Sequence, residues 1–182
     1  MLIIDNVLDY SKLESGELEI EESTFNLTAI IIDVVNTFKK DADNKNIKMS
    51  YSTQPEVAEN YIGYSARILQ VLMHLTDNAV KFTRQGKVKV TVAVNESTHT
   101  TTKLYFEVLD SGIGIPDKEK DNLFTAFTQV DNSIAREYDG TEPGLSLCKN
   151  LVALMNGEIG VKDAEAGGSI FWFTLKLERA DV

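Results

Sequence analysis

The sequence has one cysteine, two histidines, no internal repeat and no low-complexity tract in 182 residues. A single cysteine, Cys148, excludes an internal disulfide framework and a cysteine-rich metal site, which fits a reducing compartment. No apolar run approaches the ~20 residues of a membrane-spanning helix, and no signal peptide opens the sequence. The net charge of −10 argues against non-specific nucleic-acid binding and leaves no polybasic membrane patch.

The sequence does have enough apolar residues for a core, since 43% of it is hydrophobic. Its length suits one domain with a short appendage. Apolar spacing predicts helices over 26–44, 64–82 and 145–155, and strands over 47–53, 87–94, 104–109, 157–162 and 169–177. We therefore predict an α+β two-layer sandwich, in which a mixed, mostly antiparallel sheet is covered on one face by three helices.

The remaining segments are less regular. Residues 1–13 carry one helical apolar stripe, too short for a core of its own, so it must pack against a missing segment or a second copy. Residues 17–22 alternate acidic and apolar side chains, as a short edge strand does. Residues 95–102 are expected to form a polar loop. Residues 117–144 lack periodicity, and long stretches of this kind are usually lids or binding loops.

The most informative stretch follows the strand expected at 104–109. Asp110 stands at the strand end, and Gly112 and Gly114 follow it. A carboxylate there can accept a hydrogen bond from an exocyclic amine, and the glycines let backbone and ligand approach closely. This pattern predicts a purine pocket. Taken alone, it also fits a polar turn after a strand.

The second helix presents a stripe of three polar side chains beside its apolar face. His74 and Asn78 are i,i+4 neighbours, and Lys81 follows three residues later. A carboxamide oxygen suits a hard cation such as Mg²⁺, and an ammonium suits phosphate oxygens. The stripe therefore predicts a metal–phosphate site. A solvated helix edge with a capping asparagine is the alternative for this helix alone.

Together these segments resemble a known family, the sensor histidine kinases. Residues 67–83 resemble its N-box, 110–116 its G1 box, 123–129 its F box, 140–147 its G2 box and 167–173 its closing strand. In the same order, the sequences of these five segments are RILQVLMHLTDNAVKFT, DSGIGIP, LFTAFTQ, GTEPGLSL and GGSIFWF. Residues 5–16 are similar to the end of the second dimerisation helix of hybrid-type kinases. The resemblance covers essentially the whole chain, with the motifs in family order.

The resemblance implies the Bergerat ATP-binding fold, shared with type II topoisomerases and mismatch-repair ATPases. Residues 1–16 would end the dimerisation hairpin, and 17–182 would form the catalytic and ATP-binding domain, with a lid at about 128–143.

In that domain Asp110 would bind the adenine amino group, with Ser169 supporting it through water. Asn78, with His74 beside it, would coordinate Mg²⁺, Lys81 would meet phosphates and Phe82 would line the base. The other nucleotide-binding residues implied are Gly112, Gly114, Ile115, Thr141, Gly144 and Leu145.

The implied function is to supply the γ-phosphoryl group of ATP to a histidine. The only histidines are His74 and His99, and neither stands where the family carries its phosphoacceptor. We therefore expect a fragment of a longer protein whose acceptor lies upstream. The implied partners are its own dimerisation domain, a response regulator or receiver domain, and a second subunit in a homodimer, with no nucleic acid. The fragment would be a cytoplasmic domain of a protein anchored in the inner membrane.

Two motifs depart from the family pattern. His74 stands where the family usually has asparagine, and an imidazole matches Mg²⁺ poorly. In the G2 box, Glu142 and Pro143 replace residues of a glycine-rich loop, which adds charge and removes an N–H donor beside the phosphates. A degenerate kinase domain that serves as an interaction module therefore remains the alternative. A Bergerat ATPase unrelated to signalling is a third hypothesis, which the segment at 5–16 argues against.

Overall fold

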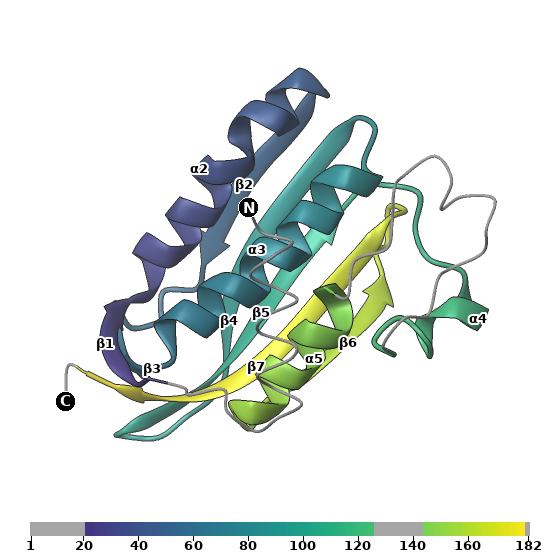
Figure 1. Ribbon diagram of the computed structural model, residues 1–182. Coiled ribbons are helices and arrows are strands. Elements are labelled where there is room, and N and C mark those ends of the chain that lie inside the picture. The colour runs from purple at the N-terminus through teal and green to yellow at the C-terminus, as the bar shows by residue number, and fades with distance from the viewer. Residues whose placement is uncertain (1–20, 126–143, 181–182) are drawn as a thin grey trace.

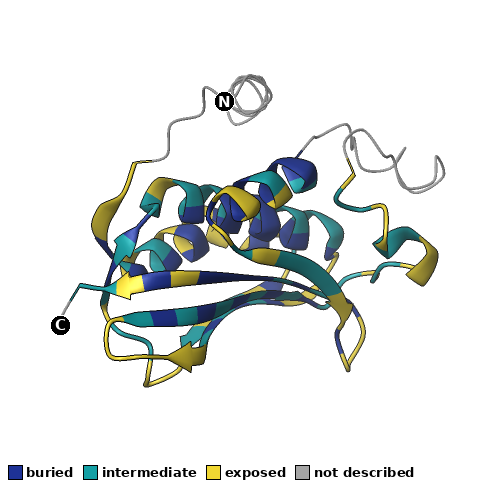
Figure 2. Cartoon of the chain, turned by 90° about the horizontal axis from the view of Figure 1, so that it is seen from below, coloured by how far each residue is buried: buried dark blue, intermediate teal, exposed yellow. Residues whose placement is uncertain are grey.

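The structure is a computed structural model that describes residues 21–125 and 144–180. These residues form two layers, a sheet and a set of helices (Figure 1). The helices α2, α3 and α5 cover one face of the sheet, and no described element covers the other face (Figure 2). The two-layer α+β architecture predicted from the sequence is confirmed.

The strands and helices have the following bounds. The strands are β1 (Ser23–Asn26), β2 (Ile47–Thr53), β3 (Asn60–Gly63), β4 (Gly86–Ser97), β5 (Thr101–Asp110), β6 (Glu158–Asp163) and β7 (Ser169–Arg179). The helices are α2 (Leu27–Asn44), α3 (Ser65–Phe82), α4 (Asp117–Lys120) and α5 (Gly144–Leu154).

The sheet runs in the order β1-β3-β7-β5-β4-β2, and β6 pairs with β7 beside this path. Strands β2 and β4 are parallel, and the other pairs are antiparallel, as predicted. In the antiparallel register of β5 and β7, Leu109 lies opposite Ile170. This register brings the end of β5, at Asp110, beside the start of β7, at Ser169.

The helices form where apolar periodicity and capping agree. In α2 the Oδ1 of Asn26, the N-cap residue, accepts a hydrogen bond from the Ala29 N–H at 2.8 Å. Ile31, Val34 and Phe38 then face the sheet and are buried. The helix ends at Asn44, because Asn46 adopts a positive φ of 55° that turns the chain away.

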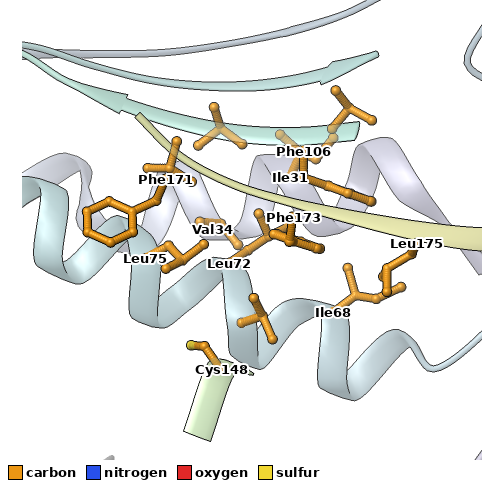
Figure 3. Packing of buried hydrophobic residues seen from close by; sticks show 14 of the residues in the cluster. Ile31, Val34, Ile68, Leu72, Leu75, Phe106, Cys148, Phe171, Phe173 and Leu175 are labelled. Atoms are coloured by element: carbon orange, nitrogen blue, oxygen red, sulfur yellow. The ribbon is translucent and has the colours of Figure 1, made fainter. Parts of the chain in front are cut away.

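The core lies between these helices and the inner face of the sheet. Alternate residues of β5 are buried, and the Phe106 ring stacks on Phe173 of β7 with centroids 4.4 Å apart. Leu72 and Leu75 of α3 pack against them from the helical layer (Figure 3). Each such side chain, fully buried, contributes about 1.5–3 kcal/mol. The core thereby holds the ends of β5 and β7 in register.

Several predicted elements are confirmed, and others are wrong. Strands β1 and β3 were missed, and residues 95–102 extend β4 and begin β5 around a tight turn instead of forming a polar loop. Residues 21 and 22 precede β1 and are not in a strand, and the rest of the edge strand expected at 17–22 lies outside the described residues. The helix expected at 1–13 and the lid at 128–143 lie outside them too. Among the described residues, no helix combines the length and apolar character needed to cross a membrane.

Candidate functional site

Asp110 is the centre of the candidate site. It ends the central strand β5 and is only 4% exposed. Its Oδ1 accepts hydrogen bonds from the N–H of Gly112 at 2.8 Å and from the N–H of Ser169 at 3.3 Å. Its Oδ2 accepts no hydrogen bond from any residue that the structure describes. One carboxylate oxygen is thus held by the backbone, and the other remains for a donor from a ligand.

The environment of Asp110 has opposing effects on its charge. Burial raises the pKa of the Asp110 carboxyl above its ordinary value, and the N–H groups of Gly112 and Ser169 partly offset this effect. The carboxyl is therefore partly desolvated in the ligand-free fold, and a donor arriving at Oδ2 would compensate for the lost water.

Gly112 allows the turn after β5 to approach the end of α3. A Cβ on Gly112 would lie 2.5 Å from the Phe82 carbonyl oxygen and 2.9 Å from Asp110 Oδ1, so no larger residue fits without a shift. Gly114 has a φ of +73°, which favours glycine for conformational reasons. The sequence singled out both positions, and the structure gives each its own physical reason.

Gly168 is a site residue that the sequence analysis missed. Its φ is +93°, and a Cβ there would lie 2.1 Å from the Asp110 carbonyl oxygen. It precedes Ser169, which is 3% exposed and donates directly from its backbone to Asp110. The signal in the sequence was the pair Gly167-Gly168 at the start of the last strand.

Helix α3 places the predicted phosphate-binding residues along one row. His74 is 8% exposed, and a Cβ on Gly144 would lie 3.2 Å from its Nδ1, so the imidazole lies against the first residue of α5. Asn78 and Lys81 are partly buried one and two turns further along, and the Lys81 Nζ lies 5.9 Å from the Phe82 ring centroid. The row thus runs from Gly144 at one end to Gly112, beside Phe82, at the other.

The remaining predicted residues divide into two groups. Ile115 and Leu145 are partly buried and pack against the core. Thr141 lies outside the described residues, as do Glu142 and Pro143 of the altered loop. The structure therefore brings Asp110, Gly112 and Ser169 together directly, and brings His74 to Gly144.

Two further observations concern polar groups in this region. The hydroxyl of Thr83, at the end of α3, is buried and has no hydrogen-bond partner among the described residues. No group of three or more His, Cys, Asp or Glu side chains suited to a metal ion occurs in residues 21–125 and 144–180. Among the side chains that α3 places here, the carboxamide oxygen of Asn78 is the ligand type that suits Mg²⁺.

Comparisons with known proteins find relatives that match nearly the whole chain. Residues 63–179 match the family described as histidine kinase-, DNA gyrase B-, and HSP90-like ATPase. Hybrid signal transduction histidine kinase K of Dictyostelium discoideum is 38% identical over 184 residues, covering 97% of this chain and 15% of that protein. Signal transduction histidine-protein kinase BarA of Escherichia coli (strain K12) is 35% identical over 178 residues, covering 98% of this chain and 19% of that protein. The chain thus spans less than a fifth of the length of either relative.

Solved structures show the same fold. Full-length ShkA in complex with AMPPNP superimposes with a TM-score of 0.85 at 24% identity, covering 99% of this chain and 36% of that one. Histidine kinase ThkA in complex with response regulator protein TrrA gives a TM-score of 0.69 at 26% identity, covering 98% of this chain and 47% of that one. The structural neighbours are histidine kinase catalytic domains with the Bergerat fold, as predicted. The chain belongs to the histidine kinase-, DNA gyrase B- and HSP90-like ATPase family, and its relatives are hybrid sensor histidine kinases.

Proposed function

We propose that this chain is the ATP-binding catalytic domain of a two-component sensor histidine kinase, which supplies the γ-phosphoryl group of ATP to a histidine outside the sequence given. The observation that carries the proposal is the buried Asp110 carboxylate, whose Oδ1 is held by the backbone N–H groups of Gly112 and Ser169. A fixed, partly desolvated acceptor at the end of a central strand suits the exocyclic amine of adenine.

At the purine end, the adenine amine donates to Asp110 Oδ2. Gly112 and Gly114 leave room for the base beside the backbone, and the Phe82 ring lines it. The positions of Asp110 and the turn are set before the nucleotide arrives, because the register of β5 with β7 fixes them. Little ordering is then required on binding, which favours affinity.

At the phosphate end, Lys81 and the first residues of α5, Gly144 and Leu145, meet the phosphates, together with Thr141. The carboxamide oxygen of Asn78 is a ligand type that Mg²⁺ accepts, whereas the His74 imidazole is a poor one. When bound, Mg²⁺ neutralises charge on the phosphate oxygens. In the transfer, the bond from the γ-phosphorus to the β–γ bridging oxygen breaks, a phosphorus–nitrogen bond to the acceptor histidine forms, and ADP leaves.

The partners follow from the same function. The acceptor histidine would belong to the dimerisation domain, of which residues 1–16 form the end, in a homodimeric protein. A response regulator or receiver domain would then take the phosphoryl group, and the structural neighbour ThkA forms a complex with such a regulator, TrrA. The domain would lie in the cytoplasm, within a protein anchored in the inner membrane.

Calorimetric titration of the chain with ADP tests the purine site. Asp110→Asn should weaken ADP binding at least about tenfold, equivalent to about 1.4 kcal/mol, since it replaces an acceptor oxygen by a donor. Glu107→Gln is the matched control, because Glu107 lies on the same strand but pairs with Lys162 on the uncovered face of the sheet. Equal affinity of Asp110→Asn and the parent would refute the assignment.

A second function, an interaction module without kinase activity, is favoured by one group of observations. His74, Glu142 and Pro143 depart from the family pattern, and all three belong to the phosphate end. A parent chain that binds neither ADP nor ATP, with or without Mg²⁺, would support the module. Binding of ATP and Mg²⁺ that depends on Asp110 would support the kinase domain.

A further inference from the structure

The C-terminal turn of α2 contacts the two segments that border the purine end of the site. Lys45, at the end of α2, extends its side chain to the last turn of α3, and its Nζ donates to the carbonyl oxygens of Val80 at 2.9 Å and Lys81 at 3.3 Å. The carbonyl groups of a helix's last turn lack partners within the helix and carry partial negative charge. An ammonium that donates to two of them stabilises this end of α3 by charge-assisted hydrogen bonds.

The residue that follows Lys45 also holds the start of β4. Asn46, next to Lys45, accepts a hydrogen bond at its carbonyl from the N–H of Gly86, at 3.4 Å. Residues 83–85 connect α3 to β4, so Lys45 and Asn46 contact the chain on both sides of this connection. The connection is therefore braced at its two ends by one turn.

Both braced ends touch the turn that follows Asp110. On the α3 side, the Phe82 carbonyl lies so close to Gly112 that a Cβ would come within 2.5 Å of it. On the β4 side, Ser111 exchanges two hydrogen bonds with Lys87, its N–H donating to the Lys87 carbonyl at 3.1 Å and its Oγ accepting from the Lys87 N–H at 2.9 Å. The turn after β5 thus rests on the two segments that Lys45 and Asn46 hold.

We propose that Lys45 is a positioning residue for the nucleotide site: through the end of α3, and together with Asn46 at the start of β4, it holds Gly112 and Ser111 in the arrangement that orients Asp110. This inference rests on the proposed function. It assigns a role to a residue that touches no nucleotide and stands outside every motif identified in the sequence. Removing the ammonium would remove its hydrogen bonds to two carbonyls of α3 and would loosen the turn beside Asp110.

ADP titration of three lysine variants tests the proposal. Lys45→Met keeps most of the side-chain volume and should weaken ADP binding about tenfold. Lys45→Arg retains a charged donor and should stay within about threefold of the parent. Lys39→Met is the matched control on the same helix, since Lys39 is 61% exposed and only contacts Asp43, and it should bind as the parent does.

A core variant separates positioning from general loss of stability. Val34 is fully buried in α2, so Val34→Ala should destabilise the fold without altering the end of α3. At a temperature well below both unfolding transitions, Val34→Ala should bind ADP like the parent, whereas Lys45→Met should not. Equal weakening in the two variants would overturn the proposal, as would parent-like affinity in Lys45→Met.

Amide hydrogen exchange without nucleotide provides a readout that does not depend on the proposed function. Lys45→Met should speed amide exchange at Gly112 and Ser111. Val34→Ala should change the exchange rates of these two amides no more than those of the rest of the sheet. If the parent fails to bind ADP, the proposed function falls, and the exchange data still decide whether Lys45 orders this turn. If Lys45→Met does not fold, Lys45→Gln, which keeps one donor group, replaces it in both measurements.

Discussion

The proposed purine end of the site is formed mainly by backbone groups at strand ends, and the proposed phosphate end is formed mainly by side chains of one helix. At the purine end, Asp110 stands at the end of β5, and the backbone N–H groups of Gly112 and Ser169 donate to its carboxylate. At the phosphate end, side chains of one helical face, His74, Asn78 and Lys81, stand beside the start of α5. The first end depends on the register of the sheet, and the second depends mainly on which side chains α3 carries.

The departures from the family pattern all fall at the proposed phosphate end. His74, Glu142 and Pro143 all belong to the phosphate end, and the purine end keeps its carboxylate and glycines. A Cβ at Gly112 or Gly168 would collide with backbone carbonyls. Change at either glycine would therefore cost stability as well as binding.

The largest effect we expect comes from placing a Cβ at the purine end. Gly168→Ala adds a methyl group 2.1 Å from the Asp110 carbonyl at a φ of +93°, whereas Gly167→Ala meets nothing within 4 Å at a φ of +87°. Both carry backbone strain of roughly 1–2 kcal/mol, and Gly168→Ala adds overpacking of about 1–3 kcal/mol. Urea unfolding should show the larger loss for Gly168→Ala. Equal losses would mean that the contact with Asp110 is unimportant.

At the proposed phosphate end, restoring the family residues should raise ATP affinity. Glu142→Gly with Pro143→Leu restores an N–H donor and removes a charge that opposes the phosphates by about 1 kcal/mol, so ATP affinity with Mg²⁺ should rise about fivefold or more. ADP affinity should change less, because it lacks the γ-phosphate. His74→Asn should raise ATP affinity further but not additively, since the two changes act on one triphosphate. An unchanged ATP affinity, measured by calorimetry, would show that this loop is not the limiting defect.

The smallest effect concerns the stability of the ligand-free chain and its pH dependence. Because burial raises the pKa of Asp110, the folded state binds this proton more tightly than the unfolded state. The free energy of unfolding should then fall as pH rises from the unfolded pKa of about 3.9 through the higher folded value. Asp110→Asn removes this pH-dependent fall in the free energy of unfolding. The variant should therefore be at least as stable as the parent at pH 7 while binding ADP more weakly.

Urea unfolding of both proteins between pH 3 and pH 7 measures this contribution. The stability difference between variant and parent should shrink as pH falls through the window, since the parent's carboxyl is then neutral like the amide. A parent that instead gained stability over the variant with rising pH would contradict the inferred cost of burying the carboxylate.

The sequence predicted the layers better than it predicted the edges of the sheet. Helices α2, α3 and α5 were predicted within about one residue, because long apolar stripes with a cap such as Asn26 are strong local signals. Strands β1 and β3 span four residues each and were missed, because so short a segment carries no periodicity of its own. Residues 95–102 were expected to form a loop because they are polar, but most of them continue β4 or begin β5, and only 98–100 form the turn.

The sequence by itself predicted the fold class and the family, both of which are confirmed, and it named Asp110, Gly112 and Gly114 as candidate site residues, since each prediction rests on local pattern or on motifs in order. Only the tertiary structure revealed that Gly168 lies against the Asp110 carbonyl and that Lys45 donates to the carbonyls at the end of α3. These contacts join residues far apart in the chain, and their existence depends on strand register and helix packing. No spacing along the sequence encodes such a distance, so the supports of the site became visible only in the folded chain.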